Sequence, residues 1–181
     1  MKKIKVGDPD KLWFTSDTHF CHKNIIRFCD RPFGSIEEHN QGLVDNWNSV
    51  VPVDADVWHL GDFCFGGSAE WHHLVGALNG RIHLVLGNHD TVASEPMLDL
   101  FESVHMMARL EVSGHRELWL SHFPLQTWPG KFYGKAWNLY GHIHSQTKPE
   151  TEEDTQYDVG VDRNGYKPVS YQAIVDILKG K

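Results

Sequence analysis

The stretch IHLVLGNHD, residues Ile82 to Asp90, joins a short apolar run to three polar side chains. Residues 82–86 have the length and β-branched character of a buried strand in an α/β sheet. Gly87 ends the run, and an Asn-His-Asp triplet follows directly. In open α/β sheets, ligands bind at the loops beyond the carboxyl ends of the strands. The stretch therefore predicts a strand that delivers coordinating side chains to such an edge.

Four further apolar segments also end in residues that can hold a metal ion. They are LWFTS before Asp17 and His19, ADVWHLG before Asp62, RELWLS before His122, and AWNLYG before His142 and His144. Together with Asn88, these residues are more ligands than one ion with an open position needs. They suit two ions that share a bridging carboxylate. Imidazole and carboxylate without cysteine favour manganese, iron, zinc, cobalt or nickel over calcium.

The hydrophobic pattern predicts the order of the elements. Strands are expected over residues 11–16, 56–60, 82–86, 137–140 and 157–161, with a hairpin of residues 103–112 and 117–120. Helices are expected over residues 23–28, 35–50, 68–78, 94–100 and 170–178, with Ser35 and Ser68 as N-caps. Helices alternate with strands early in the chain, and strands dominate later. This order predicts one α/β domain over residues 1–181, with two mixed sheets packed face to face and helices outside.

Composition limits the class of protein and its partners. The 181 residues carry a net charge of −7, which argues against a broad duplex-DNA surface with its basic footprint. No apolar stretch approaches the ~18 residues of a membrane helix, and no apolar signal region follows the first lysines. Cys21, Cys29 and Cys64 lack C-x-x-C spacing and are expected to be reduced thiols in a cytoplasmic protein. The oligomeric state stays open.

Five short motifs follow one another along the chain: DTH from Asp17, GD from Gly61, GNHD from Gly87, SHFP from Ser121 and GHIH from Gly141. In this order they resemble the calcineurin-like metallophosphoesterase superfamily, from about residue 12 to residue 162. The resemblance implies a four-layer α/β/β/α sandwich that hydrolyses phosphate esters with two divalent ions. Manganese is the expected metal, with iron, zinc, nickel and cobalt as alternatives.

The resemblance also implies a role for each motif residue. One ion would be held by Asp17, His19 and His144, the other by Asn88, His122 and His142, with Asp62 bridging both. A metal-bridging hydroxide would attack the phosphorus atom. His89 would stabilise the developing charge or protonate the leaving oxygen, and Asp90 could orient His89. Asn88 would also lie beside the substrate.

One motif departs from the superfamily pattern. In the protein Ser/Thr phosphatases the GD motif continues as GDxVDRG, which supplies an orienting Asp and a phosphate-binding Arg. Here it continues as GDFCFGG, with Phe65 at the position of that Asp and no Arg after it. This difference argues against a protein phosphatase and leaves the phosphate-binding arginine unassigned. Arg31 and His22 are the candidates for substrate contact, and a solvated surface position is the alternative for each.

The expected substrate is a small phosphodiester or nucleotide-like molecule, because the chain is short and acidic and has no added cap domain. A nuclease on single-stranded or branched nucleic acid is the first alternative, although nucleic acid is not favoured. A non-catalytic scaffold is the second, but such scaffolds lose ligands and here all seven ligands and His89 are present. An aromatic loop containing Trp128, Phe132, Tyr133 and Trp137 either stacks on a base or is a plain hydrophobic loop.

Overall fold

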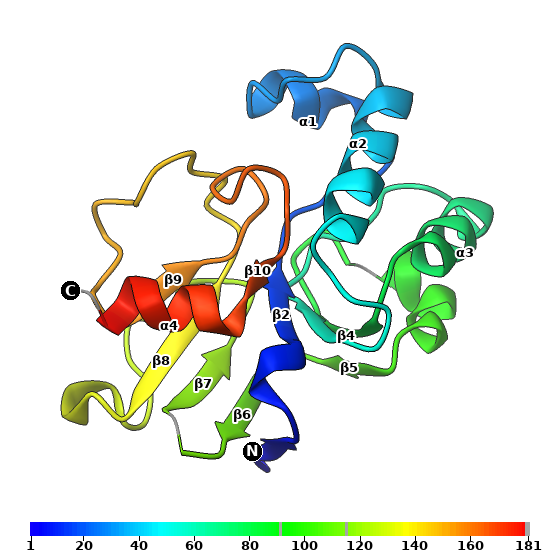
Figure 1. The fold of residues 1–181 in the computed structure, drawn as a ribbon. Coiled ribbons are helices and arrows are strands. Elements are labelled where there is room, and N and C mark those ends of the chain that lie inside the picture. Colours follow the sequence, from blue (N-terminus) through cyan, green and yellow to red (C-terminus); the bar gives the residue numbers. More distant parts are fainter. Residues whose placement is uncertain (91, 115, 180–181) are drawn as a thin grey trace.

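Two five-stranded sheets and the helices around them make up the computed structural model, which describes residues 1–90, 92–114 and 116–179 (Figure 1). The strand orders are β10-β2-β3-β4-β5 and β1-β6-β7-β8-β9. Each sheet contains both parallel and antiparallel pairs. The predicted fold class, two mixed sheets with flanking helices, is confirmed. Over the described ranges, no helix combines the length and apolarity needed to cross a membrane.

The first sheet has a parallel centre. Its parallel strands are β2 (Leu12–Thr15), β3 (Asp56–His59), β4 (Arg81–Val85) and β5 (Ser103–His105), and β10 (Val169–Ser170) pairs antiparallel with β2. Parallel strands covered on both faces consist of continuous apolar runs, which made β2, β3 and β4 predictable. The two residues of β10 are too few to form a recognisable pattern.

Alternate residues of this sheet point into two different hydrophobic cores, one on each face. Phe14 lies opposite Trp58, and both belong to the buried cluster that also contains the inner residues of the second sheet. The alternate residues Val57 and Leu84 belong to the other cluster, which includes Trp47 and other helix residues. One face of the first sheet therefore packs against the second sheet, and the opposite face packs against helices.

The second sheet is less regular. Its strands are β1 (Ile4–Val6), β6 (Ala108–Val112), β7 (Glu117–Leu120), β8 (Ala136–Tyr140) and β9 (Gln156–Asp158). β6 and β7 form the predicted antiparallel hairpin, while β7, β8 and β9 run parallel. Leu110, Leu118 and Leu139 point into the core between the sheets.

The prediction of a single strand over residues 103–112, as the first arm of the hairpin, is wrong. Residues 103–105 form β5, which pairs with β4 at the edge of the first sheet. Residues 108–112 form β6 in the second sheet. Met106 and Met107 connect the two strands. The residue pattern is strand-like on both sides of this connection, and only the identity of the neighbouring strand reveals the crossover.

Helices cover the first sheet most heavily. Among the described residues, the α-helices are α1 (Lys23–Phe28), α2 (Ile36–Asn48), α3 (Ser68–Ala77) and α4 (Tyr171–Lys179), and the 3-10 helices are η1 (Pro9–Lys11), η2 (Val92–Leu100) and η3 (Lys131–Tyr133). The predicted cap of α2 is confirmed, since the Ser35 hydroxyl accepts a hydrogen bond from Glu38 N–H at 3.1 Å. Gly67, not Ser68, is the N-cap of α3. The helix predicted over 94–100 is 3-10 and contains Pro96, which lacks an N–H for helical bonding.

Candidate metal centre

The loops after β2, β3, β4, β7 and β8 meet at one edge of the sandwich. Backbone bonds connect the first two loops, because Asp17 N–H donates to Gly61 O and His19 N–H donates to Asp62 O, each at 3.0 Å. His142 N–H, in the loop after β8, donates to Asp17 Oδ2 at 2.8 Å. The fold therefore brings together the predicted ligands from distant parts of the chain.

The backbone at these ligands is left-handed rather than extended. Positive φ angles occur at Asp17 (59°), His19 (49°), Asp62 (59°), His142 (74°) and His144 (53°). Asp17 and His19 therefore converge from a left-handed backbone and not from an extended chain. Non-glycine residues adopt this conformation rarely and at an energetic cost, and such residues cluster at functional sites.

Two motif glycines make room for the carboxylates. A Cβ atom at Gly87 would overlap Asp62 Oδ1, and a Cβ atom at Gly141 would overlap Ser16 Oγ and Asp17 Oδ2. Any side chain at either position would displace a predicted ligand. The glycines of the GNHD and GHIH motifs are therefore explained by close packing against Asp62 and Asp17.

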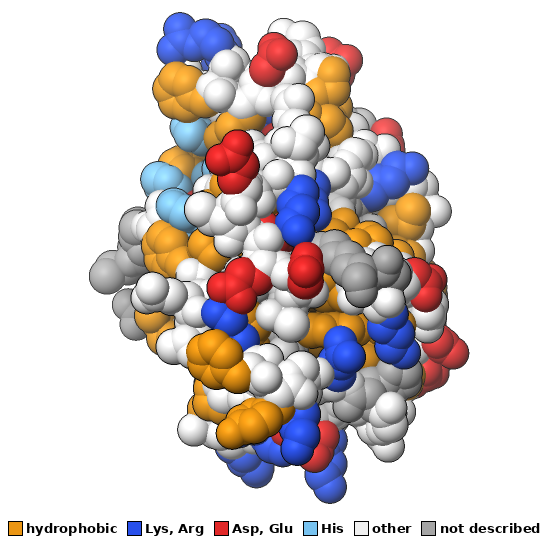
Figure 2. All heavy atoms as spheres, turned by 90° about the vertical axis from the view of Figure 1, so that its left-hand side faces the viewer, with side chains coloured by type: hydrophobic (Ala, Val, Ile, Leu, Met, Phe, Trp, Pro, Cys, Tyr) orange, Lys and Arg blue, Asp and Glu red, His pale blue; other side chains and the backbone are white. Residues whose placement is uncertain are grey.

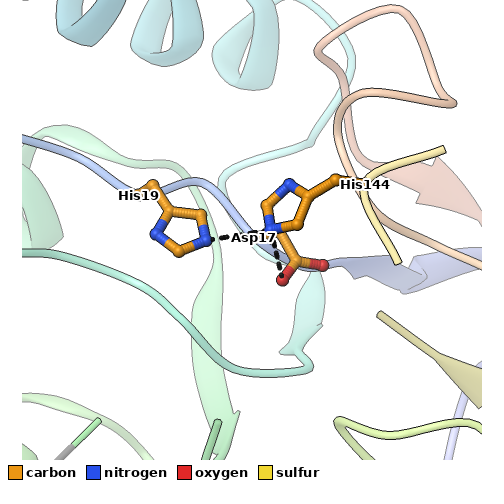
Figure 3. Close-up of side chains that lie close together, drawn as sticks. All are labelled: Asp17, His19 and His144. Carbon is orange, nitrogen blue, oxygen red and sulfur yellow. Dashed lines mark hydrogen bonds and ion pairs between the residues drawn. The ribbon is translucent and has the colours of Figure 1, made fainter. Parts of the chain in front are cut away.

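The first ligand group consists of Asp17, His19 and His144, whose ligand atoms all lie within 4.8 Å of one another (Figure 3). His19 Nε2 and His144 Nε2 are 3.2 Å apart, and His144 Nε2 is 3.7 Å from Asp17 Oδ1. Asp17 and His19 are buried, and His144 is half-buried. Two imidazole nitrogens and one carboxylate oxygen thus point at a common position.

The second ligand group lies beside the first. Asp62, His122 and His142 also have ligand atoms within 4.8 Å of one another. Asn88 joins this group, because its Oδ1 is 2.9 Å from His122 Nε2. Asp62 Oδ2 is 3.6 Å from His19 Nε2 and 3.5 Å from His122 Nε2. One carboxylate oxygen therefore lies between the two groups.

The unpartnered atoms at this edge fit a cation. Asp17 Oδ1 is buried and has no hydrogen-bond partner among the described residues, and burial raises the pKa of its carboxyl. A buried carboxylate oxygen without a donor is costly unless a positive charge faces it. Burial, followed by the nearby His144, lowers the pKa of His19 far below its usual range, so its ring is neutral. Neutral imidazole and carboxylate are the metal-binding forms of these side chains.

A buried ion pair supports the first group from behind. His144 Nδ1 lies 2.8 Å from Asp162 Oδ2, and Arg31 binds both oxygens of Asp162 at 2.8 Å. Burial acts to raise the pKa of Asp162, but hydrogen bonds from His144 and Arg31 hold it below its usual range. Carboxylates in this position fix the orientation of a metal-binding histidine and raise its basicity.

The predicted contact of Arg31 with phosphate is contradicted by this arrangement. The Arg31 side chain is fully buried, and its guanidinium also donates to Asp17 O at 2.8 Å and to Thr18 O at 2.9 Å. A fifth contact joins Arg31 Nη1 to His39 Nε2 at 2.9 Å. No donor of this fork is left to reach a ligand at the surface, because each one already has an internal acceptor.

Two supporting residues differ from the sequence prediction: the role predicted for Asp90 is wrong, and Asp162 was not predicted. Asp90 does not orient His89. Its carboxylate accepts from the backbone N–H groups of Asp62, Gly87 (both 2.8 Å) and Phe63 (3.2 Å) and so holds the bridging carboxylate loop in place. Asp162 was missed, although it follows an apolar segment as the predicted ligands do.

His89 and His22 lie beside the first group. His89 is exposed, its N–H donates to Asp62 Oδ1 at 2.9 Å, and its ring is 5.6 Å from that of His19. His22 is half-buried and stacks on Phe65 at 4.2 Å. Both predicted substrate-side residues therefore border the ligands without belonging to either group.

The aromatic loop lies elsewhere. Trp128 and Trp137 are buried, while Phe132 and Tyr133 are exposed in η3. This 3-10 helix precedes β8, whereas His142 and His144 follow it, so the loop lies at the opposite end of that strand (Figure 1). The hydrophobic alternative therefore holds for the two tryptophans, and the other two rings are remote from the candidate centre.

Known proteins resemble this chain along nearly its whole length. The profile of the calcineurin-like phosphoesterase family matches residues 10–176. An uncharacterized protein of Methanocaldococcus jannaschii is 34% identical over 178 residues, covering 94% of this chain and 93% of its own. The Gene 66 protein of Mycobacterium phage L5 is 32% identical over 197 residues, covering 92% and 93%.

A solved structure agrees with the fold. The crystal structure of a protein of unknown function from Aquifex aeolicus superimposes with a TM-score of 0.75 at 27% identity, covering 92% of this chain and 98% of that one. The family profile spans every predicted ligand, from Asp17 to His144. The chain therefore belongs to the calcineurin-like phosphoesterase family and is a metal-dependent hydrolase of phosphate esters.

Proposed function

We propose that the protein is a phosphodiesterase that works with two divalent ions, manganese first among the candidate metals. Asp17, His19 and His144 would hold one ion, and Asn88, His122 and His142 the other. Asp62 would bridge both. When bound, the two ions would supply positive charge for the phosphate oxygens and lower the pKa of water at the site.

One observation carries the proposal for two ions. Asp62 Oδ2 lies at nearly equal distances from a nitrogen of each group, 3.6 Å from His19 Nε2 and 3.5 Å from His122 Nε2. The other oxygen, Oδ1, accepts the His89 N–H. The carboxylate is thus oriented by a bond on one oxygen and leaves the second free for ligation. This division suits a carboxylate that bridges two ions through one oxygen.

The remaining residues divide the work of hydrolysis. Water adds to phosphorus, the bond from phosphorus to the leaving oxygen breaks, and that oxygen takes up a proton. His89 is exposed beside the first group, where it can donate this proton. His22 lies farther out, against Phe65, where it can contact the departing group.

The buried ion pair of Arg31 with Asp162 supports a phosphodiester over a phosphomonoester as the substrate. A phosphodiester carries one negative charge, whereas a phosphomonoester carries nearly two at neutral pH. The arginine predicted to meet the additional charge is buried in an internal ion pair. We therefore expect diesters to be the better substrates.

The test compares bis(p-nitrophenyl) phosphate with p-nitrophenyl phosphate, using protein loaded separately with manganese, nickel, zinc or magnesium. We expect two ions per chain by elemental analysis and a higher kcat/KM for the diester with manganese. One ion per chain would contradict the shared bridge, and a faster monoester would contradict the substrate class.

The role of His89 has its own test. In His89→Ala both ions should stay bound, since no metal contact is assigned to its ring. Hydrolysis of alkyl esters should slow more than hydrolysis of nitrophenyl esters, because a good leaving group needs no proton. Loss of one ion would make His89 a ligand, and equal slowing of both substrates would mean that it stabilises the phosphoryl oxygens instead.

The rival functions have weaker support. A scaffold would not need a complete ligand set, yet every predicted position is filled in both groups. A nuclease of single-stranded or branched nucleic acid remains the alternative enzyme. The cytoplasmic location stays a prediction from the cysteines, all three of which are free thiols.

A further inference from the structure

Large hydrophobic side chains remain exposed around the candidate metal centre. Phe65 is 42% exposed and Phe123 is 49% exposed, and each contacts rings of predicted ligands. Phe28 (63%) and Ile143 (40%) lie beside them in the chain segments that carry His22 and His144. Figure 2 shows histidine side chains gathered on one face with hydrophobic side chains directly around them. Exposed apolar surface of this kind at a site indicates a binding surface.

The rings on the first group's side form a connected series. The Phe65 ring lies 5.4 Å from the ring of the ligand His19 and 5.0 Å from that of His89. His22 stacks on Phe65 with 12° between the ring planes, and Phe28 meets His22 edge-on at 6.4 Å. We call Phe65, His22 and Phe28 the aromatic shelf. It leads from the first ligand group outward to solvent.

The surface across the centre is different. Phe123 meets the rings of His122 and His142 edge-on, at 5.0 and 4.5 Å. It is a single ring beside the second group, without a stacked partner among the described residues. A phosphodiester held between the two groups would direct one substituent toward the shelf and the other toward Phe123.

We propose that the aromatic shelf binds a planar aromatic substituent of the phosphodiester, with a nucleobase as the fitting chemical class. This inference rests on the proposed function, because it places the phosphate at the two ligand groups. His22 stacks on the Phe65 ring and fixes its orientation. The Phe65 side chain is still 42% exposed and can contact a ligand. Stacking of a base on an aromatic side chain contributes ~1–3 kcal/mol and tolerates different bases.

The experiment measures the binding of phosphomonoesters, which the proposed function makes the poorer substrates. Adenosine 5′-monophosphate and ribose 5-phosphate carry the same phosphate and sugar and differ only in the base. Titration calorimetry with manganese-loaded protein should give an affinity about 5- to 150-fold higher for the nucleotide. In Phe65→Ala this ratio should fall to near one, whereas Phe65→Tyr, which keeps the ring, should preserve it. Phe65 is substantially exposed, so the substitution should leave the fold intact.

Phe132→Ala is the matched control. It also removes an exposed phenylalanine ring, 83% exposed in η3, but at the far end of β8, so the nucleotide-to-sugar ratio should stay at the wild-type value. Equal affinity for the two compounds in the wild-type protein would contradict base binding at the aromatic shelf. Loss of the nucleotide-to-sugar affinity ratio in Phe132→Ala would also contradict it. The first result would leave the exposed rings as a surface for a protein partner. If no phosphate ester were hydrolysed but the preference for the nucleotide persisted, the proposed phosphodiesterase function would be wrong, while base binding at the aromatic shelf would be supported.

Discussion

The two ligand groups differ in how firmly the fold holds them. In the first group, Asp17 and His19 are buried, and His144 is fixed by an internal ion pair of Asp162 and Arg31. In the second group, Asn88 is exposed. His122 is buried, but its Nδ1 faces the backbone carbonyl of Leu60 at 2.7 Å instead of a carboxylate.

The two groups should therefore differ in how much each contributes to the stability of the fold and in how readily each loses its metal ion. A carboxylate behind an imidazole raises its basicity more than a neutral carbonyl does. The first group also shares its supporting residues with the buried interior, so disturbing it should destabilise the fold. The second group includes the exposed Asn88 and the half-buried His142, and it should lose its ion with less structural damage. We expect the first ion to bind more tightly.

The largest effect is expected from removing the residue that the groups share. Asp62→Asn should lower kcat/KM by more than about a thousandfold, because both ions lose a charged ligand at once. Metal content and steady-state rates with manganese measure it. Asp54→Asn, an exposed acid paired with Lys11, is the control and should match wild type. Near-normal activity of Asp62→Asn would mean that no ligand is shared.

Arg31→Met tests the support of the first group. Breaking a buried ion pair on one side costs about 3–5 kcal/mol, so the free energy of unfolding of the metal-free protein should fall by that amount. Urea denaturation measures the change. Arg31→Lys keeps the charge without the two-pronged contact and should lose less. Unchanged stability with a raised KM would restore the phosphate-binding role that the structure contradicts.

Asn88→Ala tests the second group. Because Asn88 is exposed, the free energy of unfolding should change by less than about 0.5 kcal/mol. The affinity for the second ion should drop by about a hundredfold, while the first ion stays bound. Calorimetric titration of manganese resolves the two steps. Simultaneous loss of both ions would show that the groups do not bind independently.

The smallest effect concerns pH. Burial, followed by the charge of Arg31, lowers the pKa of His39 to about 4, so between pH 6.5 and 4 the unfolded chain binds a proton that the folded protein does not. Stability contributed by neutral His39 is therefore present above pH 6.5 and is lost as pH falls. Between pH 7 and 5.5 the wild type should lose about 1 kcal/mol more than His39→Gln, which keeps an acceptor for Arg31.

His73→Gln, at an exposed position on α3, is the control for removing a histidine as such. Urea denaturation at each pH measures the difference between the variants. Parallel pH curves for wild type and His39→Gln would mean that His39 is not held neutral in the folded protein.

Local pattern was sufficient for much of the architecture. Continuous apolar runs revealed β2, β3 and β4, and Ser35 with Glu38 marked the start of α2. The crossover between β5 and β6 was not readable, since Met106 and Met107 fit a strand as well as a connection. Its position depends on which strand lies next to residues 103–105, and that neighbour is β4, about twenty residues earlier.

The sequence by itself determined the family and the residue types at the strand ends, because five motifs occur in order, each after an apolar segment. The tertiary structure alone decided what Arg31 and Asp90 do. Both were interpreted by proximity along the chain, yet Arg31 pairs with Asp162, 131 residues away, and Asp90 bonds to the Asp62 loop. A charged side chain that folding removes from water must find its partners in space, and those partners lie wherever the two sheets bring them.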